Sequence, residues 1–98
     1  MNASQLRERL TKNLLDDIGQ SQFPSVTMLD RVEGMLGNVD ALGDYAEKLV
    51  EKVEATRFPS IAMLNRVDAV IARLEQLEQE QAEQAEQAEQ ERERAEAA

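Results

Sequence analysis

The chain contains no cysteine and no histidine. It therefore lacks the usual ligands of structural zinc and haem, a thiolate nucleophile and the base of a Ser-His-Asp triad. Carboxylates alone could bind a hard cation, but no D-x-D-x-D-G loop occurs. Disulfide bonds are excluded, so cysteine usage says nothing about the redox compartment. We expect no metal, no cofactor and no enzymatic activity.

Proline, glycine and aromatic residues are also scarce, with Pro 2, Gly 4, Phe 2, Tyr 1 and Trp 0 in 98 residues. Ala, Leu, Glu, Gln, Arg and Val dominate instead, and most of these favour helix. The composition predicts one small all-α domain with an aliphatic core. Such a domain typically keeps only about 3–5 kcal/mol of net stability, so self-association or a partner would help it.

Long hydrophobic runs are absent as well. No apolar stretch approaches the ~18 residues that a membrane span needs. The first residues, Met1 to Ser4, are polar and lead into a charged helix, so we expect no secretory signal. The sequence predicts a soluble intracellular protein, with the cytoplasm as its compartment and a virion as the alternative.

Positive charge is scarce at the C-terminal end. The net charge is −9. Residues 1–74 carry 9 basic and 11 acidic side chains, whereas residues 75–98 carry two arginines against nine glutamates, a net of −7. Neither half presents a basic footprint, so we expect no direct nucleic-acid binding. The lack of a long apolar run leads us to expect no membrane partner either.

An internal repeat is the clearest positive feature. The segment FPSVTMLDRV at 23–32 returns as FPSIAMLNRV at 58–67, an offset of 58 − 23 = 35 residues. A period of this length is typical of one helical supersecondary unit that has been duplicated. We therefore predict an all-α fold of two tandem antiparallel helical hairpins, which form a small four-helix arrangement with an extended last helix.

Turn chemistry places the predicted helix boundaries. Pro24 and Pro59 break helices, and Ser25 and Ser60 suit the N-cap that follows each of them. A third boundary is predicted at Gly43, with a left-handed glycine at C′ and a capping box from the residues after it. The resulting helices span 4–21, 25–42, 44–57 and 60 onward. Another boundary, at 37–38, would interrupt an apolar seam.

Apolar residues recur at helical spacing in each segment. The first helix carries one face, and each helix after Phe-Pro-Ser carries a seam of alternating four- and three-residue steps. These sets are Leu6, Leu10, Leu14 and Ile18; Met28, Val32, Met35, Val39 and Leu42; and Met63, Val67, Val70, Leu74 and Leu77. They predict a repeat domain over 1–77, with repeat 1 at about 4–42, repeat 2 at about 44–77, and a tail at 78–98.

Two repeated features have both a functional and a structural interpretation. Phe23 and Phe58 could present a duplicated recognition loop, but an aromatic ring that closes the end of the bundle is the favoured interpretation. The seam methionines Met28, Met35 and Met63 could form an adaptable binding surface, and core packing is favoured for them.

Charged side chains at matching positions in the two repeats predict ion pairs. Arg31 and Arg66 lie beside the two seams and are expected to pair with carboxylates across the helix contact. The candidate partners by repeat position are Asp16, Asp17, Glu51 and Glu54. Asp16 and Asp17 could also suggest a general acid and base, but adjacent helical residues diverge and do not converge on one substrate atom.

The tail has three interpretations. It could be a solvated helical extension, a coiled-coil handle, or an acidic ligand for a basic partner. Ala-Glu-Gln occurs three times over residues 82–90, and this spacing does not hold one helical face. We expect the tail to continue the fourth helix into solvent and to fray toward Ala98.

Two functions follow as hypotheses. The first is a non-enzymatic protein–protein interaction or assembly module that self-associates, or docks on a larger protein, through apolar helix faces. The expected contact residues are Val67, Val70, Ile71, Leu74 and Leu77, and the supporting turn and core residues are Phe23, Pro24, Ser25, Met28, Val32, Met35, Phe58, Pro59, Ser60 and Met63. The alternative is an acidic inhibitor or DNA mimic that acts through its negative surface.

Overall fold

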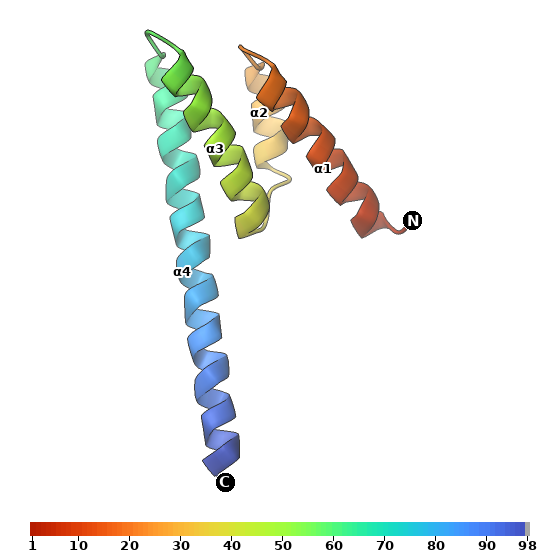
Figure 1. Ribbon diagram of the computed structural model, residues 1–98, viewed down its shortest axis with the longest axis vertical. Coiled ribbons are helices and arrows are strands. Elements are labelled where there is room, and N and C mark those ends of the chain that lie inside the picture. Colours follow the sequence, from red (N-terminus) through yellow and green to blue (C-terminus); the bar gives the residue numbers. More distant parts are fainter. Residues whose placement is uncertain (98) are drawn as a thin grey trace.

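The computed structural model describes residues 1–97, which form an all-helical fold (Figure 1). The helices are α1 (Ala3–Gln20), α2 (Val26–Glu33), α3 (Val39–Ala55) and α4 (Ile61–Ala97). No strand occurs among residues 1–97. The all-α class predicted from the sequence is confirmed.

The four helices make a flat molecule. Helices α1 and α2 lie side by side, and so do α3 and α4, with α3 next to α1 as well (Figure 1). The connections 21–25 and 56–60 lie at the same end of the molecule. The principal extents are 60 × 36 × 17 Å. The longest dimension reflects α4, whose 37 residues amount to roughly 55 Å of helix at 1.5 Å per residue.

The predicted serine caps are confirmed. Ser25 Oγ accepts a hydrogen bond from the Met28 N–H at 3.1 Å, and Ser60 Oγ accepts one from the Met63 N–H at 3.1 Å. Each hydroxyl satisfies a backbone donor that the first turn of a helix leaves unpaired.

The predicted boundary at Gly43 is wrong. Helix α2 ends at Glu33, the next helix begins at Val39, and Gly43 lies inside α3. Asn38, in an extended conformation, is the N-cap of α3: its side chain accepts a hydrogen bond from the Ala41 N–H at 2.8 Å. No glycine among residues 1–97 has a positive φ, so the left-handed C′ glycine predicted at position 43 does not occur.

Tertiary contacts explain why the chain turns at 34–38 instead. Gly34 and Gly37 both raise the cost of continuing a helix through this segment, by about 1 kcal/mol each relative to alanine. The turn lets Leu36 and Leu42 enter the core from either side of the break. Arg73 of α4 donates hydrogen bonds to the carbonyl oxygen of Glu33, which the end of α2 leaves without a helical partner, and to that of Leu36 in the turn.

The core lies where α3 meets the other helices. Its buried residues are Leu15, Ile18, Leu29, Val32, Leu36, Leu42, Tyr45, Ala46, Leu49, Val67 and Val70. Met28 and Met63 are partly buried and pack against this cluster, whereas Met35 lines a groove between α1 and α3. Four of the eleven buried residues belong to α3, so α3 is the central element of the fold.

The tail continues α4. Helix α4 reaches Ala97, and every side chain from Glu78 to Ala97 is exposed. Figure 1 shows this part of α4 projecting well beyond the other three helices. The predicted fraying at Ala98 lies outside the described residues.

Candidate functional site

The contact surface predicted on α4 is mostly internal. Val67 and Val70 are 8% and 4% exposed and belong to the core, so their assignment to an exposed contact is wrong. Ile71, Leu74 and Leu77 are partly buried and pack against the same core. The apolar seam of α4 packs inside a single chain because α3 lies along it.

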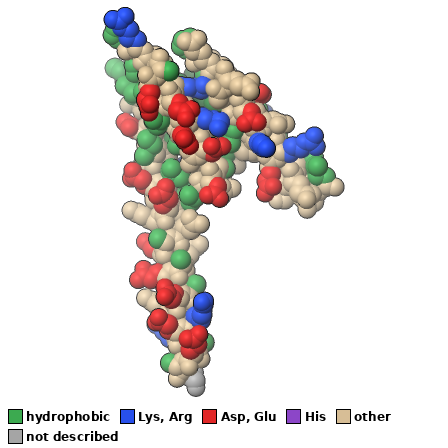
Figure 2. Space-filling view, viewed as in Figure 1, with side chains coloured by type: hydrophobic (Ala, Val, Ile, Leu, Met, Phe, Trp, Pro, Cys, Tyr) green, Lys and Arg blue, Asp and Glu red, His purple; other side chains and the backbone are tan. Residues whose placement is uncertain are grey.

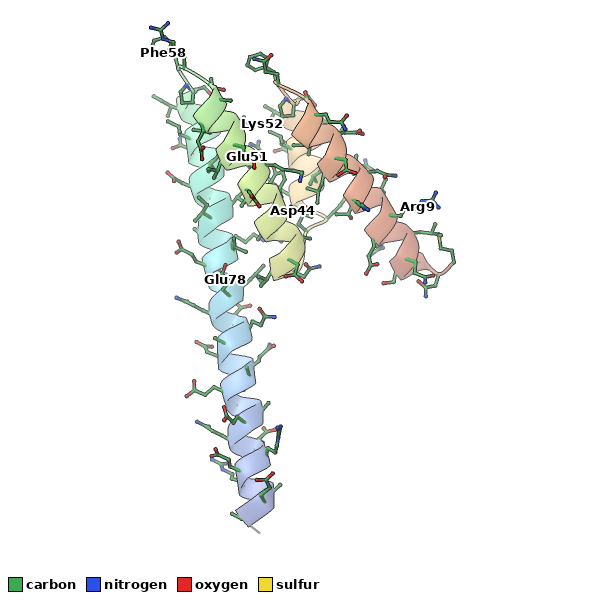
Figure 3. The ribbon with its side chains drawn as sticks, viewed as in Figure 1. Arg9, Asp44, Glu51, Lys52, Phe58 and Glu78 are labelled. Atoms are coloured by element: carbon green, nitrogen blue, oxygen red, sulfur yellow. The ribbon has the colours of Figure 1, made fainter. Side chains whose placement is uncertain are left out.

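The two Phe-Pro-Ser turns expose their aromatic rings. Phe23 is 77% exposed and Phe58 is 82% exposed, so the prediction that these rings close the end of the bundle is wrong. The following prolines, Pro24 and Pro59, are half-buried. Successive side chains in an extended segment point in opposite directions, so a proline on the inner side leaves the preceding phenylalanine in solvent. In Figure 3 Phe58 lies at the tip of the connection between α3 and α4 and points away from both helices.

Two aliphatic residues extend this apolar surface. Val26 and Ile61 are 63% and 76% exposed and follow the two phenylalanines by three residues each. Phe23, Val26, Phe58 and Ile61 together form what we call the turn patch. Val26 and Ile61 were not predicted as site residues, although the 35-residue offset relates them as it relates the phenylalanines.

Both turns border one groove of about 260 Å³. Its walls include Phe23 and Pro24 from the first turn, and Phe58 and Pro59 from the second. Met63 and Val53 also line this groove. The guanidinium of Arg57 lies over the Phe58 ring, 5.4 Å from its centroid. The turn patch therefore combines rigid apolar side chains, a shallow groove and one exposed cation.

The turn patch is held in place from the α3 side. The Lys52 ammonium donates hydrogen bonds to the carbonyl oxygens of Gly19, at 3.3 Å, and of Ser21. Those carbonyls lie where α1 ends and the first turn begins. Lys52 thereby fixes the first turn beside the second. The two hydrogen bonds join residues that are 33 and 31 positions apart in the chain, and the sequence pattern did not reveal them.

A charged cluster connects α2, α3 and α4. Arg66 pairs with Asp30 at 2.8 Å and also with Glu33, whose carboxylate accepts a hydrogen bond from the Tyr45 hydroxyl at 2.5 Å. The hydrogen bond with Asp30 contributes most to raising the pKa of Arg66, and burial contributes most to raising that of Tyr45, with Glu33 adding to it. Both pKa shifts favour the forms that these groups already have near neutral pH, a charged Arg66 and a neutral Tyr45.

The carboxylate partners predicted for the two repeat-related arginines are wrong. Among residues 1–97, Arg31 and the four predicted carboxylates form no ion pair, and Arg66 uses Asp30 and Glu33 instead. The physical reason is the short α2, whose acidic side chains face α4 directly. The predicted carboxylates are Asp16, Asp17, Glu51 and Glu54.

A second apolar surface lies on α1. Leu6 and Leu10 are 52% and 45% exposed, although Leu14 and Ile18 of the same predicted face contact the core. Helix α2 has 8 residues against 18 in α1, so it covers only the C-terminal half of α1. On α3, by contrast, Tyr45 stands 35 residues after Leu10 and is fully buried, because α4 is long enough to cover it.

A broad groove of about 860 Å³ between α1 and α3 is lined mainly by charged and small polar side chains. No group of three or more metal-binding side chains occurs within residues 1–97. None of the four helices described is both long and apolar enough to cross a membrane.

No protein-family model matches the chain, no curated protein is similar to it, and no solved structure matches its fold.

Proposed function

We propose that this chain is a non-enzymatic protein-interaction module, built from two copies of one helical hairpin, and that it binds a protein partner through the turn patch. The observation that carries the proposal is the exposure of Phe23 and Phe58, at 77% and 82%. An aromatic ring at the same place in both units lies in solvent, where it contributes no packing to the single chain.

The turn patch has the features of a binding anchor. Aromatic side chains supply large contact area with few rotatable bonds, and they are enriched among the residues that dominate interface energy. The groove between the two turns gives a partner's apolar side chain a place beside both rings. The partner expected here is a protein surface that presents apolar side chains.

The expected contribution of the two phenylalanines to the free energy of partner binding is large enough to measure. Burying a phenylalanine side chain fully contributes about 1.5–3 kcal/mol. Removal of both rings would therefore weaken partner binding by about 3 kcal/mol or more, which corresponds to roughly a hundredfold in affinity. The same double substitution should leave folding nearly unchanged, because neither ring packs in the core.

Site-specific photocrosslinking in the native cell tests the proposal. A photoreactive phenylalanine analogue at position 58 should give a discrete crosslinked protein, and Phe23→Ala should remove most of that product. The same analogue at Asp68, an exposed position of α4 outside the turn patch and the tail, and a Leu6→Ala variant are the matched controls. Equal crosslinking from positions 58 and 68, or a product that survives Phe23→Ala unchanged, would contradict the proposal.

The alternative function, an acidic inhibitor or DNA mimic, predicts a different salt response. Capture through the tail would collapse as ionic strength rises, because exposed charges are screened within about 3 Å at 1 M salt. Capture through the turn patch would persist. Partner binding that does not depend on Phe23 and Phe58, and that is strongly sensitive to salt, would favour the acidic function.

A further inference from the structure

Two unpartnered surfaces of the chain have opposite charge. The exposed half of α1, residues 3–12, carries Arg7, Arg9 and Lys12 against one glutamate. The segment 75–91 of α4 carries seven glutamates and no basic side chain. None of the charged residues in either segment belongs to an ion pair among residues 1–97.

The α1 surface is an apolar line with a cation on each side. Leu6 and Leu10 are separated by four residues, so they lie on one face of the helix. Arg7 follows Leu6 by one residue and Arg9 precedes Leu10 by one, which places the two arginines on opposite sides of the leucine line. All four side chains are exposed.

The tail presents the complementary pattern. Ala85 and Ala88 border a shallow hollow of about 310 Å³ along α4, together with Glu89 and Arg92. Small side chains let another helix approach closely. Glu89 follows Ala88 by one residue and Glu91 follows it by three, so the two carboxylates flank the alanine line on opposite sides. Two alanines thus lie between two carboxylates, with Arg92 at the end of the same hollow, and Glu89 and Glu91 are the charge counterparts of Arg7 and Arg9.

The two surfaces do not meet within one molecule. Helix α1 leaves the body on one side, and the tail of α4 continues along another direction (Figure 1). In Figure 3 Arg9 on α1 and Glu78 on α4 lie on opposite flanks of the molecule. Acidic side chains follow the projecting part of α4 (Figure 2).

We propose that the α4 tail of a second copy of this chain docks on the Leu6–Leu10 face of α1, with Arg7 and Arg9 paired to its glutamates. A reciprocal contact gives a two-fold dimer, and a head-to-tail contact gives a longer chain. Each contact is small, because only two leucines and two alanines meet. The association is therefore weak, reversible and sensitive to salt. This proposal is independent of the turn patch.

Sedimentation analysis over a range of protein concentrations tests the proposal. The wild-type chain should self-associate at low salt, and the association constant should fall about tenfold or more as salt rises toward 1 M. Leu6→Ser with Leu10→Ser should reduce the association constant at least tenfold. These positions are exposed, and circular dichroism should show unchanged helicity in each variant.

Charge exchange provides the sharpest version of the test. Arg7→Glu with Arg9→Glu is one variant, and Glu89→Lys with Glu91→Lys is the other. Each alone should be monomeric, because the substituted positions then carry the same sign as the positions that they face. An equimolar mixture of the two should associate again, since the substituted α1 of one variant then meets positions 89 and 91 of opposite sign on the other, and the two unsubstituted surfaces also meet.

Three results would overturn the proposal: a wild-type chain that stays monomeric at low salt, charge variants that associate like wild type, or a mixture that remains monomeric. The Phe23→Ala, Phe58→Ala double variant should self-associate like wild type. Its failure to do so would assign self-association to the turn patch and also overturn the α1–tail contact.

Discussion

The two repeat-related arginines give a direct test of how tertiary contacts decide stability. Arg66 and Arg31 occupy matching positions 35 residues apart. Arg66 pairs with Asp30 and Glu33 of α2, while Arg31 forms no ion pair within residues 1–97. We predict that Arg66→Met destabilises the fold and that Arg31→Met, its matched control, does not. Methionine keeps most of the apolar stem in both variants.

The magnitude follows from the exposure of the partners. The side chains of Arg66 and Glu33 are 18% and 25% exposed, so their pair is only partly screened by water. A hydrogen bond to a charged group is typically worth about 1.5–3 kcal/mol. Asp30 is 64% exposed and adds well under about 1 kcal/mol. Because Tyr45 still donates to Glu33 in the variant, we expect a loss of about 2 kcal/mol.

Urea and thermal denaturation followed by circular dichroism measure the effect. A loss of about 2 kcal/mol corresponds to a fall of about 10 °C in Tm for a domain of this size. Arg31→Met should change the free energy of unfolding by less than about 0.5 kcal/mol, as exposed substitutions usually do. Equal losses from the two variants, or no loss from Arg66→Met, would refute the assignment of Arg66 as a stabilising link between α2 and α4.

Other predictions concern individual side chains elsewhere in the fold. Gly43→Ala should stabilise the fold by about 0.5–1 kcal/mol in urea denaturation, because Gly43 lies inside α3 with nothing within 4 Å of an added Cβ; a loss would indicate a helix end at Gly43. Asn38→Ala should cost about 1 kcal/mol in the same assay through loss of the cap, and an unchanged free energy would contradict that role. The pKa of Tyr45 is raised above the ordinary value near 10, so the contribution of Tyr45 to stability is fully present below about pH 10 and is lost as the pH rises beyond it. Tyrosinate absorbance should therefore appear only with unfolding. Tyrosinate absorbance in the folded chain would contradict this burial. Phe23→Ala with Phe58→Ala should change Tm by no more than about 3 °C in a thermal scan, and a large fall would return the two rings to the core.

Local signals in the sequence predicted part of the site correctly. Pro24 and Pro59 interrupt helices by their own covalent structure, and Ser25 and Ser60 cap the next helix through bonds that span three residues. These effects act within one turn of chain, so the pattern of residue types is sufficient to predict them. The repeat also correctly indicated that the two turns share the same local capping chemistry.

The direction of exposed side chains could not be predicted in the same way. A phenylalanine beside an apolar seam is usually buried, yet the turn leaves Phe23 and Phe58 outside while the prolines face inward. Val67 and Val70 were expected at an exposed contact, and α3 covers them instead. Whether an apolar face is free depends on the length and position of another helix, which helical periodicity does not contain.

The amino-acid sequence by itself determined that the chain is helical, where the two proline turns lie, and that most of its net negative charge lies in the last quarter of the chain. Only the tertiary structure decided where α2 stops and which cation binds which acceptor. Arg73 of α4 binds one carbonyl at the end of α2 and one in the turn after it, and Lys52 of α3 does the same for α1. The reason is distance along the chain: capping and periodicity are read within a few residues, whereas these acceptors lie 31 to 40 residues from their donors.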